Sequence, residues 1–260
     1  MALISHVVCF VDDVEARRAF YEPVLRRNFK GTSKLLRCEC WFIAARCHAY
    51  EIPGWNVYFA VDSIDKIART LDGAIVHRAS VDDTEFAFVV DPILGAFALQ
   101  QGDGGDASAR FETPTASVAL ERLDRVLGIY VERDETAFAT TYGVHLEVPS
   151  LAGPRWLPVW HTPRLEAVVA RAVKLGARVS SVDDDSTGAS VLLVDPWGAE
   201  LVIAGEPEMP EDLPDLVSVR AATCFVDREA ERAMKAAEAR AERVRTLRAK
   251  WIRPQKTSGA

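Results

Sequence analysis

The 260-residue chain contains an internal repeat in which the tripeptide Val-Asp-Pro marks the same place in two halves. Its aspartates, Asp91 and Asp195, lie 104 residues apart. In each half an amphipathic helical pattern ends near a glycine, Gly73 or Gly176, and leads into alternating β-branched stretches before the Asp-Pro turn. A chain with such a repeat is expected to fold as successive strand–helix–strand modules.

A second repeat links the two ends of the chain. Residues 4–19 read ISHVVCFVDDVEARRA, and residues 219–233 read VRAATCFVDREAERA, so both predict a strand followed by a helix. The module that begins after the Gly/Asp-rich stretch at 101–109 shows no first strand of its own. We therefore expect the strand near residues 217–226 to fill that position, within the chain or exchanged with a second subunit in a homodimer.

The modules resemble a known superfamily. FYEPVL follows the first strand, and VDPILGA and VDPWGA stand near the ends of two modules. Repeated βαβββ modules with these marks resemble the vicinal oxygen chelate superfamily of glyoxalase I, extradiol dioxygenases and bleomycin-resistance proteins, and more narrowly its tandem glyoxalase-like members. The resemblance implies an α+β fold of tandem βαβββ modules that form two half-open barrel domains.

The expected domain organisation follows from this pattern. It comprises a first domain at 1–102, a linker at 103–110, a second domain at 111–205, a linker at 206–216, a C-terminal strand and helix at 217–252 that complete the second domain, and a disordered tail at 253–260.

The resemblance also implies a site in the first domain. Enzymatic members hold a divalent metal through the first and last strands of each module. His6, Glu51 and Asn56 stand at three of these positions, and Leu99 stands at the fourth. Imidazole and carboxylate suit Fe, Mn or Zn, whereas an amide is a weaker ligand and Leu is none. His6 is alternatively a core histidine, and Glu51 an exposed strand end.

In the second domain the resemblance places Glu147 at a ligand position, but Leu157 and Val202 occupy two others. Side chains of a strand share a face at every second residue. Buried ionisable groups are costly unless they are paired, bound to metal or used, and a His/Glu pair can act as general base and acid. Alternation predicts that four ionisable residues face this pocket, namely His145, Glu147, His161 and Glu200. Of these we expect His145, Glu147 and His161 to be catalytic, although Glu200 and His161 alternatively lie in solvent.

Alternating aromatic residues are the candidates for binding a substrate. Tyr58, Trp156 and Trp160 lie on strands that border the expected pockets, and with Glu200 they form the predicted substrate-binding set. For the tryptophans the alternative is a place in the hydrophobic core.

Charge and cysteine content exclude several classes of protein. The net charge is −7, and the segment from Arg228 onward carries ten Lys/Arg and four Glu, so the body before it has a charge of −13. An acidic body argues against nucleic-acid binding. Five cysteines without a CxxC pair indicate free thiols in a cytoplasmic protein rather than zinc ligands. No apolar run is long enough to span a membrane, and no nucleotide-binding motif is present.

These patterns predict a glyoxalase-like enzyme that acts on a small organic molecule by isomerase, lyase, ring-opening or cyclisation chemistry. It would use either a divalent metal or a His/Glu acid–base pair. The alternative is a metal-free protein that binds or sequesters a small ligand, as resistance-type members do. The sequence does not identify the substrate.

Overall fold

The computed structural model describes the parts of the chain that form the two sheets. Described residues are 3–48, 51–71, 75–81, 83–104, 107–114, 116–129, 132–133, 138–139, 144–147, 153–185, 188–205 and 246. The predicted C-terminal strand and helix at 217–252 lie outside these ranges, apart from residue 246.

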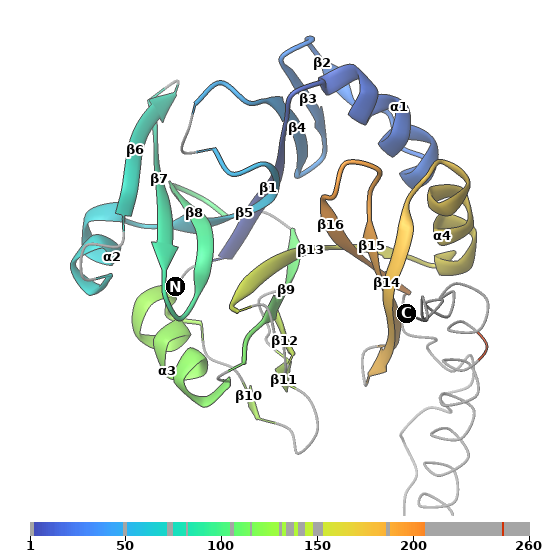
Figure 1. Ribbon diagram of the computed structural model, residues 1–260. Helices are drawn as coiled ribbons and strands as arrows, with labels where there is room; N and C mark the ends of the chain where they lie inside the picture. The colour runs from blue at the N-terminus through green and yellow to red at the C-terminus, as the bar shows by residue number, and fades with distance from the viewer. Residues whose placement is uncertain are drawn as a thin grey trace, which may run out of the picture.

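Four consecutive βαβββ modules build the fold (Figure 1). The first two contain β1 (Leu3–Val11), α1 (Val14–Leu25), β2 (Lys30–Gly31), β3 (Leu35–Cys38), β4 (Trp41–Ala45), β5 (Gly54–Val61), α2 (Ile64–Thr70), β6 (Ile75–Val81), β7 (Thr84–Asp91) and β8 (Gly95–Gln101). The last two contain β9 (Ser108–Glu112), α3 (Ala116–Leu127), β10 (Glu132–Arg133), β11 (Phe138–Ala139), β12 (Val144–Glu147), β13 (Arg155–Thr162), α4 (Leu165–Lys174), β14 (Arg178–Asp185), β15 (Gly188–Val194) and β16 (Glu200–Gly205).

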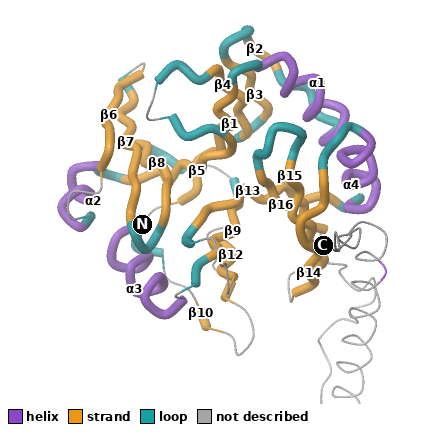
Figure 2. The backbone as a smooth tube through the Cα atoms, in the orientation of Figure 1, coloured by secondary structure: helices purple, strands orange, loops and turns teal. Residues whose placement is uncertain are grey.

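Each pair of modules forms one eight-stranded sheet among the described residues. The first sheet has the order β2-β3-β4-β1-β5-β8-β7-β6, and the second has the equivalent order β10-β11-β12-β9-β13-β16-β15-β14. The strands curve and the helices lie on their outer side, with α1 next to α4 and α2 next to α3 (Figure 2). The expectation of tandem modules in an α+β fold, with open rather than closed barrels, is confirmed.

The predicted source of the third module's first strand was wrong. β9 occupies that position, parallel to β12 and antiparallel to β13, as β1 lies between β4 and β5 in the first sheet. Residues 108–110 of the expected linker are therefore the start of this strand. The strand was missed because alternate residues on it, Arg110 and Glu112, are charged but buried, which hides the apolar pattern of a core strand.

Each half contributes one buried aspartate that joins the two domains. Asp91, in the second module, receives hydrogen bonds from Arg122 of α3 at 3.1 Å (Nε) and 2.7 Å (Nη2). Asp195, in the fourth module, receives hydrogen bonds from Arg17 and, at 2.8 Å, from Tyr21 of α1. The repeated Val-Asp-Pro turns thus hold a helix of the opposite domain, and we call these two contacts the aspartate clamps.

The same carboxylates also fix their own turns. The second oxygen of Asp91 accepts the backbone N–H groups of Ile93 and Leu94 at 2.9 Å, and that of Asp195 accepts those of Trp197 and Ala199. Burial raises the pKa of Asp91, but its hydrogen bonds with Arg122 and with these N–H groups outweigh burial, so its pKa is below the usual range. Both oxygens of each carboxylate therefore accept hydrogen bonds inside the protein.

Candidate functional site

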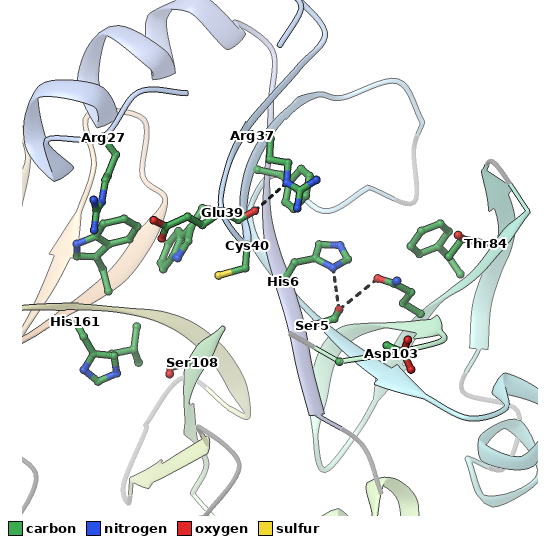
Figure 3. A pocket seen from close by; sticks show the side chains of 17 residues that line it. Ser5, His6, Arg27, Arg37, Glu39, Cys40, Thr84, Asp103, Ser108 and His161 are labelled. Atoms are coloured by element: carbon green, nitrogen blue, oxygen red, sulfur yellow. Dashed lines mark hydrogen bonds between the residues drawn. The ribbon is translucent and has the colours of Figure 1, made fainter. Parts of the chain in front are cut away.

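A cavity of about 770 Å³ lies between the two sheets (Figure 3). Its first wall comes from β1, the β3–β4 turn, β7 and β8, and its second wall comes from β9 and β13. Both walls carry an imidazole: His6 on β1 and His161 on β13. The cavity is thus formed by both domains, whereas the sequence predicted a separate pocket in each barrel.

His6 is held in place by aromatic and polar neighbours. Its ring stacks on Tyr58, with centroids 4.4 Å apart, and meets the edge of Phe42 at 5.1 Å. Its Nδ1 lies 2.8 Å from the Ser5 hydroxyl oxygen. Tyr58 is buried opposite His6 in the β1–β5 register, so it supports the imidazole from behind and does not line the cavity.

The surroundings of Ser5 favour one tautomer of His6. The single hydroxyl proton of Ser5 has two oxygen acceptors, the Tyr58 carbonyl at 3.1 Å and Gln100 Oε1 at 3.4 Å. If the hydroxyl donates to an oxygen, Nδ1 must carry the proton that it donates to Ser5. Nε2 then has a lone pair, and no described residue is recorded as its hydrogen-bond partner. In this tautomer His6 offers an acceptor at Nε2.

The pKa of His6 is lowered to about 4, mainly by burial of the ring and in smaller part by the positive charge of Arg37. We expect an NMR titration of the His6 ring to have its midpoint near 4, and Arg37→Gln to raise that midpoint. Because the folded pKa lies below the ordinary value of 6.5, the unfolded chain binds this proton first as the pH falls. The contribution of His6 to stability is thus complete above pH 6.5 and declines towards pH 4. A midpoint near 6.5 would show that the ring is solvated.

The other two residues predicted for the metal site lie apart from the His6 nitrogen. Glu51 accepts the backbone N–H groups of Cys47 at 2.5 Å and His48 at 2.9 Å, so its carboxylate closes a loop. The Asn56 amide donates to the carbonyls of Ile52 and Gly54, just before and at the start of its own strand, β5. Neither Glu51 nor Asn56 lines the cavity.

The catalytic residues predicted on β12 are placed only by their backbone. His145 pairs in register with Arg110, and Glu147 pairs with Glu112. Their side chains lie outside the described part of the chain. His161, by contrast, is exposed and lines the cavity from the C-terminal end of β13, a central strand of the second sheet.

Three of the four predicted substrate-binding residues do not line the cavity, namely Tyr58, Trp156 and Glu200. Trp156 packs in the core, where it donates to the Leu94 carbonyl at 2.7 Å and stacks on Phe111 at 4.4 Å. Glu200 pairs with Arg155, which also binds Glu112 at 2.6 Å. Only Trp160 of that set lines the cavity. β13 is buried on both faces. Alternation along this strand therefore does not show which tryptophan faces a pocket and which faces the core.

Several cavity residues were missed from the sequence. Ser5 and Gln100 orient the imidazole, and Arg37 sets its charge state. β1 and β8 flank β5 in the first sheet and so bring His6 and Gln100 into the same sheet, but Arg37 comes from a short hairpin whose direction no sequence pattern indicated.

Comparison with known proteins rests on the fold. No protein-family model matches this sequence, and no curated protein matches it. The Mn(II)-bound glyoxalase from Novosphingobium aromaticivorans superposes with a TM-score of 0.56 at 13% identity, covering 79% of this chain and 83% of that one. Homoprotocatechuate 2,3-dioxygenase from Brevibacterium fuscum, in a complex with 3,4-dihydroxyphenylacetate, gives 0.56 at 14%, covering 82% of each chain. A catechol 2,3-dioxygenase gives 0.53 at 13% identity, with 80% of this chain and 90% of that one covered.

The chain has the vicinal oxygen chelate fold. With the strands assigned, one position that the sequence resemblance suggested for a ligand needs correction. The first Asp-Pro turn is one residue longer than the second, so Ala98 rather than Leu99 stands opposite Tyr58 on the concave side of the first sheet. In the second sheet Leu157 and Val202 lie together in one buried cluster.

The described residues do not fit the metal of the vicinal oxygen chelate enzymes. No group of three or more His, Cys, Asp or Glu side chains converges in the part of the chain that the structure describes. The second sheet instead carries two arginines between carboxylates: Arg155 between Glu112 and Glu200, and Arg110 at 2.5 Å from Ser190 and 3.5 Å from Asp183. These arginines are held by protein carboxylates and hydroxyls. Among the described helices, none is long and apolar enough to cross a membrane.

Proposed function

We propose that this protein binds a small, flat organic molecule in the cavity between its two sheets, without a metal. The observation that carries the proposal is His6, an imidazole that stays neutral at pH 7 and offers Nε2 as an acceptor at the cavity wall. Such a nitrogen recognises an O–H or N–H donor. Phe42, Phe86 and Trp160 supply apolar walls for a conjugated ring.

A pair of simple ligands tests this proposal. We expect 2-naphthol to bind in isothermal titration calorimetry, and 2-methoxynaphthalene, which has no O–H donor, to bind about five- to tenfold more weakly, as a single lost hydrogen bond predicts. His6→Phe keeps an aromatic ring against Tyr58 but removes the acceptor. In this variant both ligands should bind with the same, weaker affinity.

The controls separate binding from metal dependence. Affinity should be unchanged after dialysis against EDTA, and added Mn²⁺ or Fe²⁺ should not increase it. Binding that appears only with added metal, or that is equal for both ligands in the wild-type protein, would contradict the proposal. Thermal melting of His6→Phe shows whether the variant is folded.

A second candidate is an enzyme of glyoxalase type, as the sequence resemblance suggests. It is favoured by a second imidazole, His161, which lines the same cavity as His6. Two imidazoles that face one ligand can accept and return a proton. Because its pKa is near 4, His6 would act mainly as an acceptor, and His161 is then the candidate donor. Turnover of a bound ligand that is lost in His161→Ala, with affinity unchanged, would support this candidate.

A further inference from the structure

Two arginines line the cavity, and each has its guanidinium against an aromatic ring. Arg37 lies over Phe42 with its Cζ 5.4 Å from the ring centroid, and Arg27 lies over Trp160 at 5.9 Å. Neither forms an ion pair with a described carboxylate within 4.0 Å. A stacked guanidinium is held by its face, so its N–H edge remains able to bind an anion.

Arg37 is oriented by the turn that follows it. Its Nε donates to the backbone carbonyl of Glu39 at 3.0 Å. Glu39 has a positive φ of 55°, in a two-residue turn between the paired residues Cys38 and Trp41. Residues other than glycine rarely adopt this conformation, so the surrounding structure must hold Glu39 in it. The Glu39 carbonyl that accepts from Arg37 is thereby fixed in position. With Nε engaged, the two terminal nitrogens of Arg37 are left for a carboxylate, which they match as a planar fork.

The charges around His6 single out Arg37. Phe42 lies against both groups, since its ring centroid is 5.1 Å from that of His6 and 5.4 Å from Arg37 Cζ. The cavity also contains two carboxylates, Glu39 and Asp103. In Figure 3 Glu39 lies between Arg37 and Arg27, and Asp103 lies across His6 from Arg37. The cation beside the imidazole is thus not neutralised by a described ion pair.

We infer that the ligand of this cavity is a flat organic acid, whose ring lies among Phe42, Phe86 and Trp160 and whose acid group binds the terminal nitrogens of Arg37. This inference rests on the proposed binding function and adds the charge of the ligand to it. Such a ligand would place its acid group at Arg37 and its O–H or N–H donor at His6 Nε2.

An acid and its neutral isostere test the inference. In calorimetry at low salt, 2-naphthoate should bind the wild-type protein at least about tenfold more tightly than 2-naphthamide. This is the gain in affinity expected from one charge-assisted hydrogen bond. Arg37→Gln should reduce this preference to less than about threefold. The matched variant Arg27→Gln, which removes the other cavity arginine, should keep most of it. Raising the salt concentration should weaken naphthoate more than naphthamide.

The outcomes separate this inference from the proposed function. If 2-naphthol and both isosteres bind but the acid has no advantage, the ligand is not an acid and the inference is overturned while the proposed function stands. An advantage that survives Arg37→Gln but not Arg27→Gln overturns the assignment to Arg37. If none of the three compounds binds, the proposed function itself fails. Both arginines are exposed, so their variants are expected to fold, which melting curves check.

Discussion

Replacing Asp195 with Asn should lower the free energy of unfolding by about 3–5 kcal/mol, because it leaves a buried guanidinium without its counter-charge. The Asp195 side chain is fully buried and that of Arg17 is 9% exposed. The carboxylate receives hydrogen bonds from Arg17, from Tyr21 and from two N–H groups of its own turn. The substitution therefore weakens both the turn and the contact between the domains. Urea denaturation with matched m-values measures the loss.

Two further variants show whether the charge pair is the cause. Asp12 is 90% exposed and faces Arg46 at 3.8 Å, so Asp12→Asn should change stability by less than about 0.5 kcal/mol. The double variant Asp195→Asn with Arg17→Met removes both charges and should recover part of the loss, since no charge is then left unpaired. If Asp195→Asn is as mild as Asp12→Asn, the aspartate clamp does not join the domains as described.

Replacing Trp156 with Ala should cost about 3–5 kcal/mol, the range for removing a large aromatic side chain from a packed core. Its indole stacks on Phe111, meets Phe59 edge to face at 4.9 Å, and donates to the Leu94 carbonyl. Phe59 and Leu94 belong to the first domain, so this side chain fills the interface between the sheets. Trp156→Phe keeps a ring but leaves that carbonyl unpaired, and it should cost about 1–3 kcal/mol.

Trp197 provides the matched comparison. It is 48% exposed and packs over Arg17, so Trp197→Ala should cost only about 1 kcal/mol.

Binding of 2-naphthol to Trp156→Phe should stay within about twofold of the wild-type value, because the indole does not line the cavity. A large loss of affinity in this variant, without a loss of stability, would restore the substrate-binding role that the sequence suggested.

The sequence predicted the architecture well because the repeat consists of short-range signals, each set by residues close together in the chain. Alternating strands and Asp-Pro turns recur in register, and each depends on nearby residues alone. β9 escaped notice for the opposite reason. Its buried residues Arg110 and Glu112 are stable there only because Ser190, Asp183 and Arg155 arrive from strands distant in the chain.

The site was predicted in part. His6 and Trp160 line the cavity, as does His161, but Glu51 and Asn56 turn to their own backbone. Strand parity indicates a face, and it does not say whether a polar side chain will use that face or satisfy a nearby N–H group. The catalytic roles expected of His145 and Glu147 stay predictions.

The repeated Asp91 and Asp195 show what each level of information decides. The sequence by itself determined that both aspartates stand where a β-strand gives way to a turn, since that depends on the Asp-Pro dipeptide and its neighbours. Only the tertiary structure decided that their partners are Arg122 and Arg17 of the opposite domain. A turn is fixed by residues adjacent in the chain, whereas an ion pair between domains depends on how two completed sheets pack, and no short segment encodes that packing. The same holds for the cavity, which neither half contains alone.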